Sequence, residues 1–119
     1  MLFAAPGADL VIAEWTAPPG EAWIAQLHIH HEDDEAWYVL AGELSVRVGD
    51  EDVHVPAGEA AIVPRGVPHT YRNIADTPTR YLIVMTRRIH ELVEALHAPG
   101  ARDFEATFRE YGSELLGWP

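Results

Sequence analysis

Two histidines one residue apart, His28 and His30, place the strongest constraint on how this chain can fold. Alternate side chains of a β-strand face the same way, so both imidazoles project together while Ile29 faces the opposite layer. The carboxylate of Glu35 follows a short acidic turn. Imidazole and carboxylate are donors that divalent transition metals accept. The stretch therefore predicts half of a metal site, carried on a strand.

A second stretch supplies another histidine. Gly58 is followed by Pro64, Gly66 and His69, and the stretch ends at Asn73. Proline and glycine between residues 64 and 68 are typical of a turn, and this turn would deliver His69 to the start of a new strand. One more imidazole thereby joins the two on the first strand.

Together these stretches resemble the paired motifs of the cupin superfamily. The first motif is matched by His28, His30, Glu35 and Gly42, and the second by Gly58, Pro64, Gly66, His69 and Asn73. One position departs, because the motif opens with a glycine where this chain has Ala22, with Gly20 two residues earlier. That glycine shapes a turn and binds no metal, so the departure concerns the entry to the strand and leaves the ligands in place.

The resemblance implies that one divalent transition metal ion is bound by four side chains: His28, His30, Glu35 and His69. Iron, manganese, nickel, copper and zinc all accept this donor set, and affinity order alone does not choose among them. An octahedral ion with four protein ligands keeps two positions open for substrate or dioxygen. The alternative is a closed structural site, but such sites are usually tetrahedral and rich in thiolates, and the chain has no cysteine.

The fold class expected is all-β, a cupin-type β-barrel (a double-stranded antiparallel jelly roll) with a short C-terminal helical segment. Short runs with turn residues between them predict strands at 10–15, 23–30, 35–41, 44–48, 52–55, 60–63, 69–73 and 81–86. Residues 1–119 are expected to form a single domain, with the barrel over about 8–86 and the helices over about 88–112.

After residue 86 the apolar period changes. Ile89, Leu92, Val93 and Leu96 predict an amphipathic helix, and Asp103 is the expected N-cap of a second one that Gly112 ends. We expect the apolar faces of both helices to pack on the outside of the barrel or on a partner subunit. The tail over residues 110–119 resembles the C-terminal segment of small quercetinase-like cupins.

Composition excludes several classes of partner. The formal net charge is −11 and Lys plus Arg number only 8, which argues against nucleic acid and against an anionic membrane surface. The N-terminus does not read as a signal peptide, and no apolar run is long enough to span a membrane. Together with the absence of cysteine, these features lead us to expect a cytoplasmic protein.

Strand parity also nominates residues for a substrate pocket: Gln26 beside the histidines, Trp37 beside Glu35, and Tyr71 beyond His69. For Gln26 a plain position at the barrel end is the alternative. An apolar and aromatic inner wall suits a planar or hydrophobic organic molecule. The acidic turn at residues 32–34 is expected to repel anions such as oxalate and sugar phosphates.

These features favour a metal-dependent dioxygenase acting on a small organic, flavonol-like or aromatic substrate. Glu35 is the catalytic candidate, because it alone among the four ligands can both leave the metal and take a proton. The alternative is a non-catalytic metal-binding or small-ligand-binding module. A homodimer is also expected, because an open barrel leaves strand edges that invite pairing.

Overall fold

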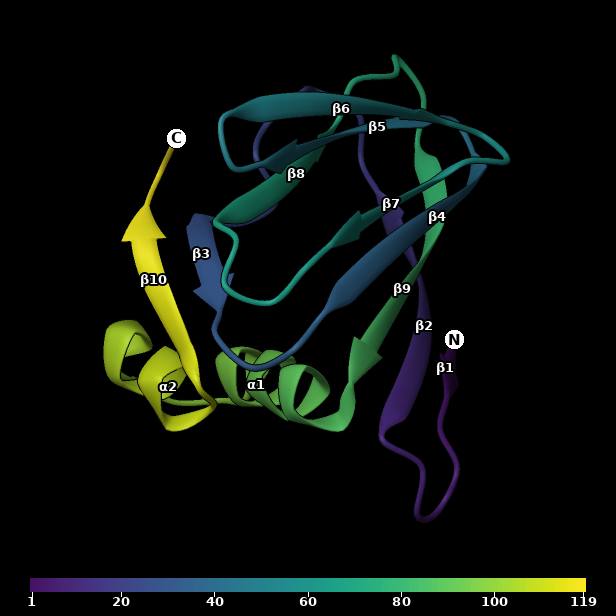
Figure 1. The fold of residues 1–119 in the computed structure, drawn as a ribbon. Helices are drawn as coiled ribbons and strands as arrows, with labels where there is room; N and C mark the ends of the chain where they lie inside the picture. Colours follow the sequence, from purple (N-terminus) through teal and green to yellow (C-terminus); the bar gives the residue numbers. More distant parts are fainter.

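Two five-stranded antiparallel sheets face each other in the computed structural model, which describes residues 1–119 (Figure 1). The first sheet has the order β1 (Leu2–Phe3), β2 (Leu10–Ala17), β9 (Thr79–Thr86), β4 (Glu35–Ala41) and β7 (Ala60–Val63). The second has the order β10 (Ser113–Gly117), β3 (Leu27–His30), β8 (His69–Asn73), β5 (Glu43–Val48) and β6 (Glu51–Pro56). The expected all-β jelly roll is confirmed.

Period-two alternation builds the core between the sheets. Along β4, Glu35, Trp37 and Val39 are buried, whereas Tyr38 lies on the outer face and is 40% exposed. Because successive side chains of a strand point to opposite faces, each strand contributes every second residue to one interior. The core includes Val11, Ala13, Val39, Leu44, Val46, Val55, Val63, Ile83 and Met85.

The strand expected at 23–30 is shorter in the structure, where β3 spans only Leu27–His30. Trp23 makes an isolated bridge to Arg72, outside any ladder. The Thr70 hydroxyl donates a hydrogen bond of 2.6 Å to the Ala25 carbonyl. A side chain thus satisfies a backbone acceptor that a continuous ladder would have used, and this interrupts the strand.

The chain enters this segment through a turn at Gly20 and Glu21, which have φ values of 125° and 61°. A positive φ is uncommon for a residue with a Cβ, and Glu21 is the only such non-glycine residue in the chain. The turn therefore falls immediately before Ala22, the position at which the motif departs.

The motif residues Gly42 and Asn73 have structural roles. Gly42 has a φ of 94°, and a Cβ added there would collide with Thr79. The Asn73 side chain donates to the carbonyls of Ala17 and Thr77 and accepts from the Ala75 N–H. Asn73 therefore fastens the end of β8 to β2 and to the turn that leads into β9.

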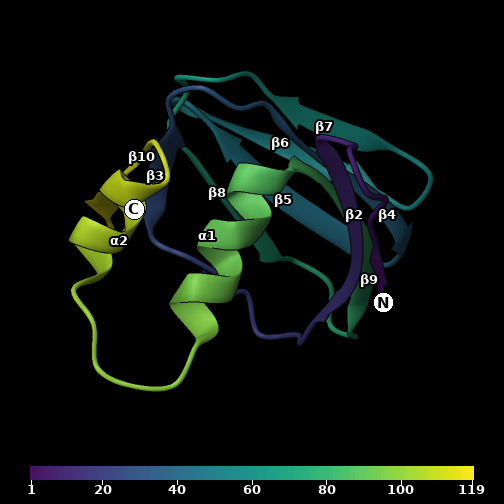
Figure 2. The same ribbon diagram turned by 90° about the horizontal axis from the view of Figure 1, so that it is seen from below.

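The two helices are α1 (Arg87–His97) and α2 (Phe104–Glu110). Seen from below, α1 lies across the open end of the barrel, between the two sheets (Figure 2). Ile89 and Leu92 on α1 are buried, and Ile89 belongs to the barrel core. The expectation that the apolar helix face packs on the outside was wrong, because this face closes the barrel interior. Neither helix has the length and apolar character needed to cross a membrane.

The last strand, β10, was not expected from the sequence. Gly112, with a φ of 67°, separates α2 from β10 and reverses the chain direction. The strand then pairs with β3, so that Ser113 lies opposite His30 and Leu115 opposite His28. The C-terminal tail thus extends the sheet that carries both histidines of the first motif.

Candidate metal centre

The four residues implied as ligands meet inside the barrel. His28 and His30 come from β3, Glu35 begins β4, and His69 begins β8 in register with His28. All four are buried, and their candidate ligand atoms lie within 4.8 Å of one another. The second sheet therefore supplies the three histidines from its neighbouring strands β3 and β8, and the first sheet supplies Glu35 from the start of β4.

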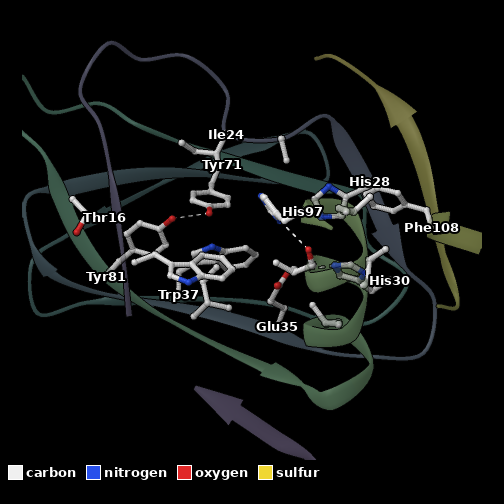
Figure 3. Close-up of a pocket in the computed structure, with 17 residues that line it drawn as sticks. Thr16, Ile24, His28, His30, Glu35, Trp37, Tyr71, Tyr81, His97 and Phe108 are labelled. Atoms are coloured by element: carbon white, nitrogen blue, oxygen red, sulfur yellow. Dashed lines mark hydrogen bonds and ion pairs between the residues drawn. The ribbon is translucent and has the colours of Figure 1, made fainter. Parts of the chain in front are cut away.

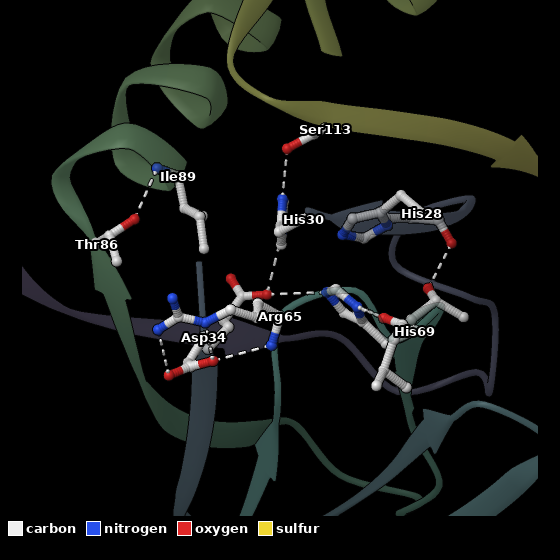
Figure 4. A network of polar contacts seen from close by, with 12 residues as sticks. His28, His30, Asp34, Arg65, His69, Thr86, Ile89 and Ser113 are labelled. Atoms are coloured by element: carbon white, nitrogen blue, oxygen red, sulfur yellow. Dashed lines mark hydrogen bonds and ion pairs between the residues drawn. The ribbon is translucent and has the colours of Figure 1, made fainter. Parts of the chain in front are cut away.

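Two of the imidazoles are oriented by backbone carbonyls; both rings lie beside His30 in Figure 4. His28 Nδ1 donates to the Gln26 carbonyl at 2.7 Å, and His69 Nδ1 donates to the Val67 carbonyl at 2.9 Å. A carbonyl can only accept, so Nδ1 carries the hydrogen in both rings, and Nε2 is left as the atom for a metal.

The third imidazole is oriented by the C-terminal strand. His30 Nδ1 lies 2.7 Å from the Ser113 hydroxyl oxygen, and that hydroxyl donates to the Tyr111 carbonyl at 3.3 Å. Because the Ser113 hydrogen is directed to Tyr111, its oxygen accepts from His30. The Nε2 of His30 thereby faces the cluster, like those of the other two rings.

The Glu35 carboxylate completes the cluster. Its Oε1 lies 3.1 Å from His69 Nε2 and 3.5 Å from His30 Nε2. Burial alone would raise the pKa of Glu35, but the contacts with His30 and His69 outweigh it and lower the pKa below its ordinary value. Glu35 is therefore an anion at neutral pH.

His28, in contrast to Glu35, is kept neutral by its burial. Burial lowers the pKa of His28 to about 3, and the neighbouring imidazoles of His69 and His30 act in the same direction. A neutral imidazole is the form that binds a metal, so His28 is prepared as a ligand at neutral pH.

The spacing of these four side chains fits a bound metal ion. Two ligand atoms each about 2.1 Å from one ion, and at right angles, stand about 3 Å apart, close to the 3.1 Å between Glu35 and His69. Three neutral nitrogen donors and one carboxylate suit a first-row divalent ion. The cluster is thus a candidate site for one divalent transition metal of unassigned identity.

A cavity of about 310 Å³ opens beside this cluster (Figure 3). His28, His30 and Glu35 lie at one end, and Tyr71 and Tyr81 lie at the other. The remaining walls are mostly apolar, and 12 of the 17 lining residues are hydrophobic. None of the 17 is Lys or Arg, and Glu35 is the only carboxylate among them.

Of the three pocket residues nominated from the sequence, Trp37 and Tyr71 line this cavity. Gln26 does not line the cavity. It lies before the start of β3, so the alternation of side chains along that strand does not extend to it. Its backbone carbonyl instead orients His28. Sequence reasoning missed the contribution of the helices. The cavity wall formed by them consists of Ile89, Leu92, Val93, Leu96, His97 and Phe108.

The acidic turn does not act as expected. Arg88 pairs with both Glu32 and Asp33, and the guanidinium of Arg65 pairs with Asp34 at 3.3 Å. Each carboxylate thus has a cationic partner, and none of the three lines the cavity. The turn therefore does not make the cavity repel anions, and the charge that a substrate can carry depends on the residues that line the cavity.

Comparison with known proteins agrees with this architecture. TT1209 from Thermus thermophilus matches with a TM-score of 0.62 and 31% identity, over 71% of this chain and 76% of that chain. The oxalate-binding protein of Thermotoga maritima is 29% identical over 75 residues, which are 63% of this chain and 60% of the relative. A mannose-1-phosphate guanylyltransferase of Salmonella muenchen is 26% identical over 80 residues, 67% of this chain. The match spans only 16% of that enzyme.

The family model described as "Cupin domain" matches residues 13–85. This range includes all four residues of the metal-type cluster. Because the match spans more than half of the 119 residues, the chain belongs to the cupin family.

Proposed function

We propose that this cupin is a divalent-metal-dependent dioxygenase that acts on a small, planar organic substrate of flavonol-like or aromatic type. The observation that carries the proposal is the cavity, in which a buried three-histidine, one-carboxylate cluster opens onto apolar and aromatic walls. Apolar cavities with few convergent polar groups are typical of sites for small organic molecules. The quercetinase-like tail supports the same assignment.

The lining residues disfavour a strongly anionic substrate. A bound divalent ion would be a cationic partner for one anionic group, but the second carboxylate of oxalate or the phosphate of a sugar would still need an Arg or Lys once water is removed. The cavity lining has neither residue, and its one charged side chain is the Glu35 anion. The names of the two enzymatic or binding relatives, which refer to oxalate and mannose-1-phosphate, therefore do not transfer readily to this cavity.

Each residue of the site has a defined part in this proposal. A divalent ion held by His28, His30, Glu35 and His69 would supply a centre at which an organic substrate and dioxygen meet. Glu35, the only carboxylate of the lining, would accept the proton of a substrate hydroxyl. Trp37 and Tyr71 would hold the planar part of the substrate, and α1 would exclude water.

The second candidate is a metal-binding or ligand-binding module without turnover. The observation that favours it is the likeness to a relative named as a binding protein. A ligand would then bind in the same cavity and leave it unchanged.

Two measurements on the same preparation separate these candidates. Metal content is determined on protein purified without added metal, and oxygen consumption is followed with flavonols, diketones and catechols. The dioxygenase proposal predicts oxygen uptake with at least one of these classes. Full metal loading without any oxygen uptake would favour the module.

A further inference from the structure

From the middle of the cavity, where Trp37 lies, to the end away from His28 and His30, three aromatic side chains form a continuous wall (Figure 3). The ring centroids of Trp37 and Tyr71 lie 5.4 Å apart, and those of Tyr71 and Tyr81 lie 5.5 Å apart. Each of the three side chains lines the cavity and is at most 6% exposed. The wall is apolar except for two hydroxyl groups and one indole N–H.

Of the two hydrogens on the Tyr71 and Tyr81 hydroxyls, one has no hydrogen-bond acceptor. Tyr71 and Tyr81 place their oxygens 2.7 Å apart and make one hydrogen bond to each other, and neither has another acceptor. An ordinary phenol has a pKa of about 10, so both hydroxyls keep their hydrogens at neutral pH. Two hydroxyls carry two hydrogens, and one shared bond uses only one of them.

The indole of Trp37 adds a second donor. Its buried N–H makes no hydrogen bond of regular geometry, although it lies near enough to the Tyr71 hydroxyl to interact with it. Buried polar groups of folded proteins are almost always paired, with protein, water or ligand. This part of the cavity therefore has more hydrogen-bond donors than acceptors, whereas the opposite end is occupied by the candidate metal ligands His28, His30 and Glu35.

We propose that the free hydrogen of the Tyr71–Tyr81 pair, beside the indole of Trp37, binds an acceptor oxygen of the substrate. The substrate would then be an aromatic molecule with two oxygen-bearing ends, one for the metal centre and a remote hydroxyl or carbonyl for the tyrosine pair. This inference rests on the proposed function, since it specifies the substrate class of the same cavity. A hydrocarbon ring without the remote oxygen would leave the buried donors unpaired and would bind more weakly.

The test compares 3-hydroxyflavone with its derivatives that carry one further hydroxyl on the phenyl ring or at the 7 position. Dissociation constants are measured with metal-loaded protein by fluorescence titration. The inference predicts that the best derivative binds roughly tenfold more tightly than 3-hydroxyflavone, the effect expected of one added hydrogen bond. This comparison uses the unaltered protein and does not depend on any variant folding.

Variants then identify the donor. A single Tyr→Phe change frees the hydrogen of the remaining hydroxyl, so the decisive variant is Tyr71→Phe combined with Tyr81→Phe. It should lose the preference for the hydroxylated derivative while its affinity for 3-hydroxyflavone stays within about twofold. Tyr38→Phe, which removes a hydroxyl from the outer face of β4, is the matched control and should behave like the unaltered protein.

The outcomes are separable from those of the proposed function. Equal affinity for all the flavones, or a preference that survives in the double variant, overturns the inference even if oxygen is consumed. A preference that disappears in the double variant supports it even if no oxygen is consumed, in which case the dioxygenase proposal fails. Absence of binding of every flavone by the unaltered protein would overturn the inference, whereas oxygen uptake with a diketone or a catechol would still support the dioxygenase.

Discussion

Ser113 accepts a hydrogen bond of 2.7 Å from His30 Nδ1, although the two residues are 83 positions apart in the chain. The contact exists because β10 pairs with β3 and places Ser113 opposite His30. The C-terminal strand therefore fixes the orientation of one of the three imidazoles in the cluster.

This contact predicts that Ser113→Ala weakens metal binding and leaves the fold intact. Partners that orient a metal-binding histidine typically contribute about 10- to 100-fold in affinity, and we expect a loss in that range. Affinity is measured by competition with a chelator of known strength. Ser45→Ala, which removes a different buried hydroxyl from β5, should retain normal affinity. An unchanged affinity of the Ser113→Ala protein would show that the contact does not tune the site.

The parts of the site that the sequence predicted correctly depend on local periodicity. Alternation along a strand is a local property. It correctly placed His28 and His30 on the inner face of β3, and Glu35 and Trp37 on the inner face of β4. It failed for Gln26, because the strand is interrupted where the Thr70 hydroxyl satisfies the Ala25 carbonyl. No periodic pattern in the sequence predicts that interruption.

The parts that were missed depend on contacts between distant segments. The apolar face of α1 was recognised, but periodicity does not say whether Ile89 and Leu92 face the barrel interior or its outside. Arg88 likewise carries no sequence signal that it neutralises Glu32. Ser113 could have been suspected only if the tail had been recognised as a strand beside β3.

Acid should destabilise the metal-free protein. His28 stays neutral in the folded chain down to a pKa of about 3, whereas in the unfolded chain it titrates near 6.5. Between these pH values the unfolded chain binds more protons, so the free energy of unfolding falls as the pH falls. The lowered pKa of Glu35 acts in the same direction, because its contribution is present above its ordinary pKa of 4.5 and is lost in acid.

Urea unfolding at pH 7 and pH 4 measures this effect. The shift of His28 alone corresponds to a loss on the order of 3 kcal/mol over this interval. His28→Gln removes the titrating group and should reduce the difference between the two pH values. Bound metal should also be released on acidification, because protonated imidazoles do not bind it. Equal stability at both pH values, or full metal occupancy at pH 4, would contradict the account.

A homodimer through the outer face of the first sheet is a further proposal. One row of paired residues crosses all five strands of this sheet and is apolar throughout: Phe3, Ile12, Val84, Ala36 and Ile62. Ile62 is 69% exposed and Phe3 48%. Exposed apolar patches of this kind are typical of protein interfaces.

Light scattering at micromolar concentration should therefore give the mass of a dimer. Ile62→Glu should shift the mass toward that of a monomer, because it buries a charge in the proposed interface. Leu116→Glu, on β10 of the other sheet, is the control and should leave the mass unchanged. A monomer mass for the unaltered protein removes the idea.

Replacement of the carboxylate tests the proton role of Glu35. Glu35→Gln keeps the shape of the side chain and removes its charge and most of its basicity. The three histidines should retain most of the metal, while turnover falls by the ~10²–10⁴-fold typical of losing a general base. Glu59→Gln, a surface change, is the control for the loss of one negative charge. Undiminished turnover in the Glu35→Gln protein would refute the assignment.

Oxygen consumption as a function of bound metal tests whether this cupin is a metal-dependent dioxygenase. Metal-free protein is titrated in turn with iron, manganese, nickel, copper and zinc in the presence of 3-hydroxyflavone and its hydroxylated derivatives. The account predicts that uptake rises with one of these metals, saturates at one ion per chain, and is lost in a His69→Gln variant. Protein that binds one ion per chain through these residues and consumes no oxygen with any substrate of these classes would contradict it.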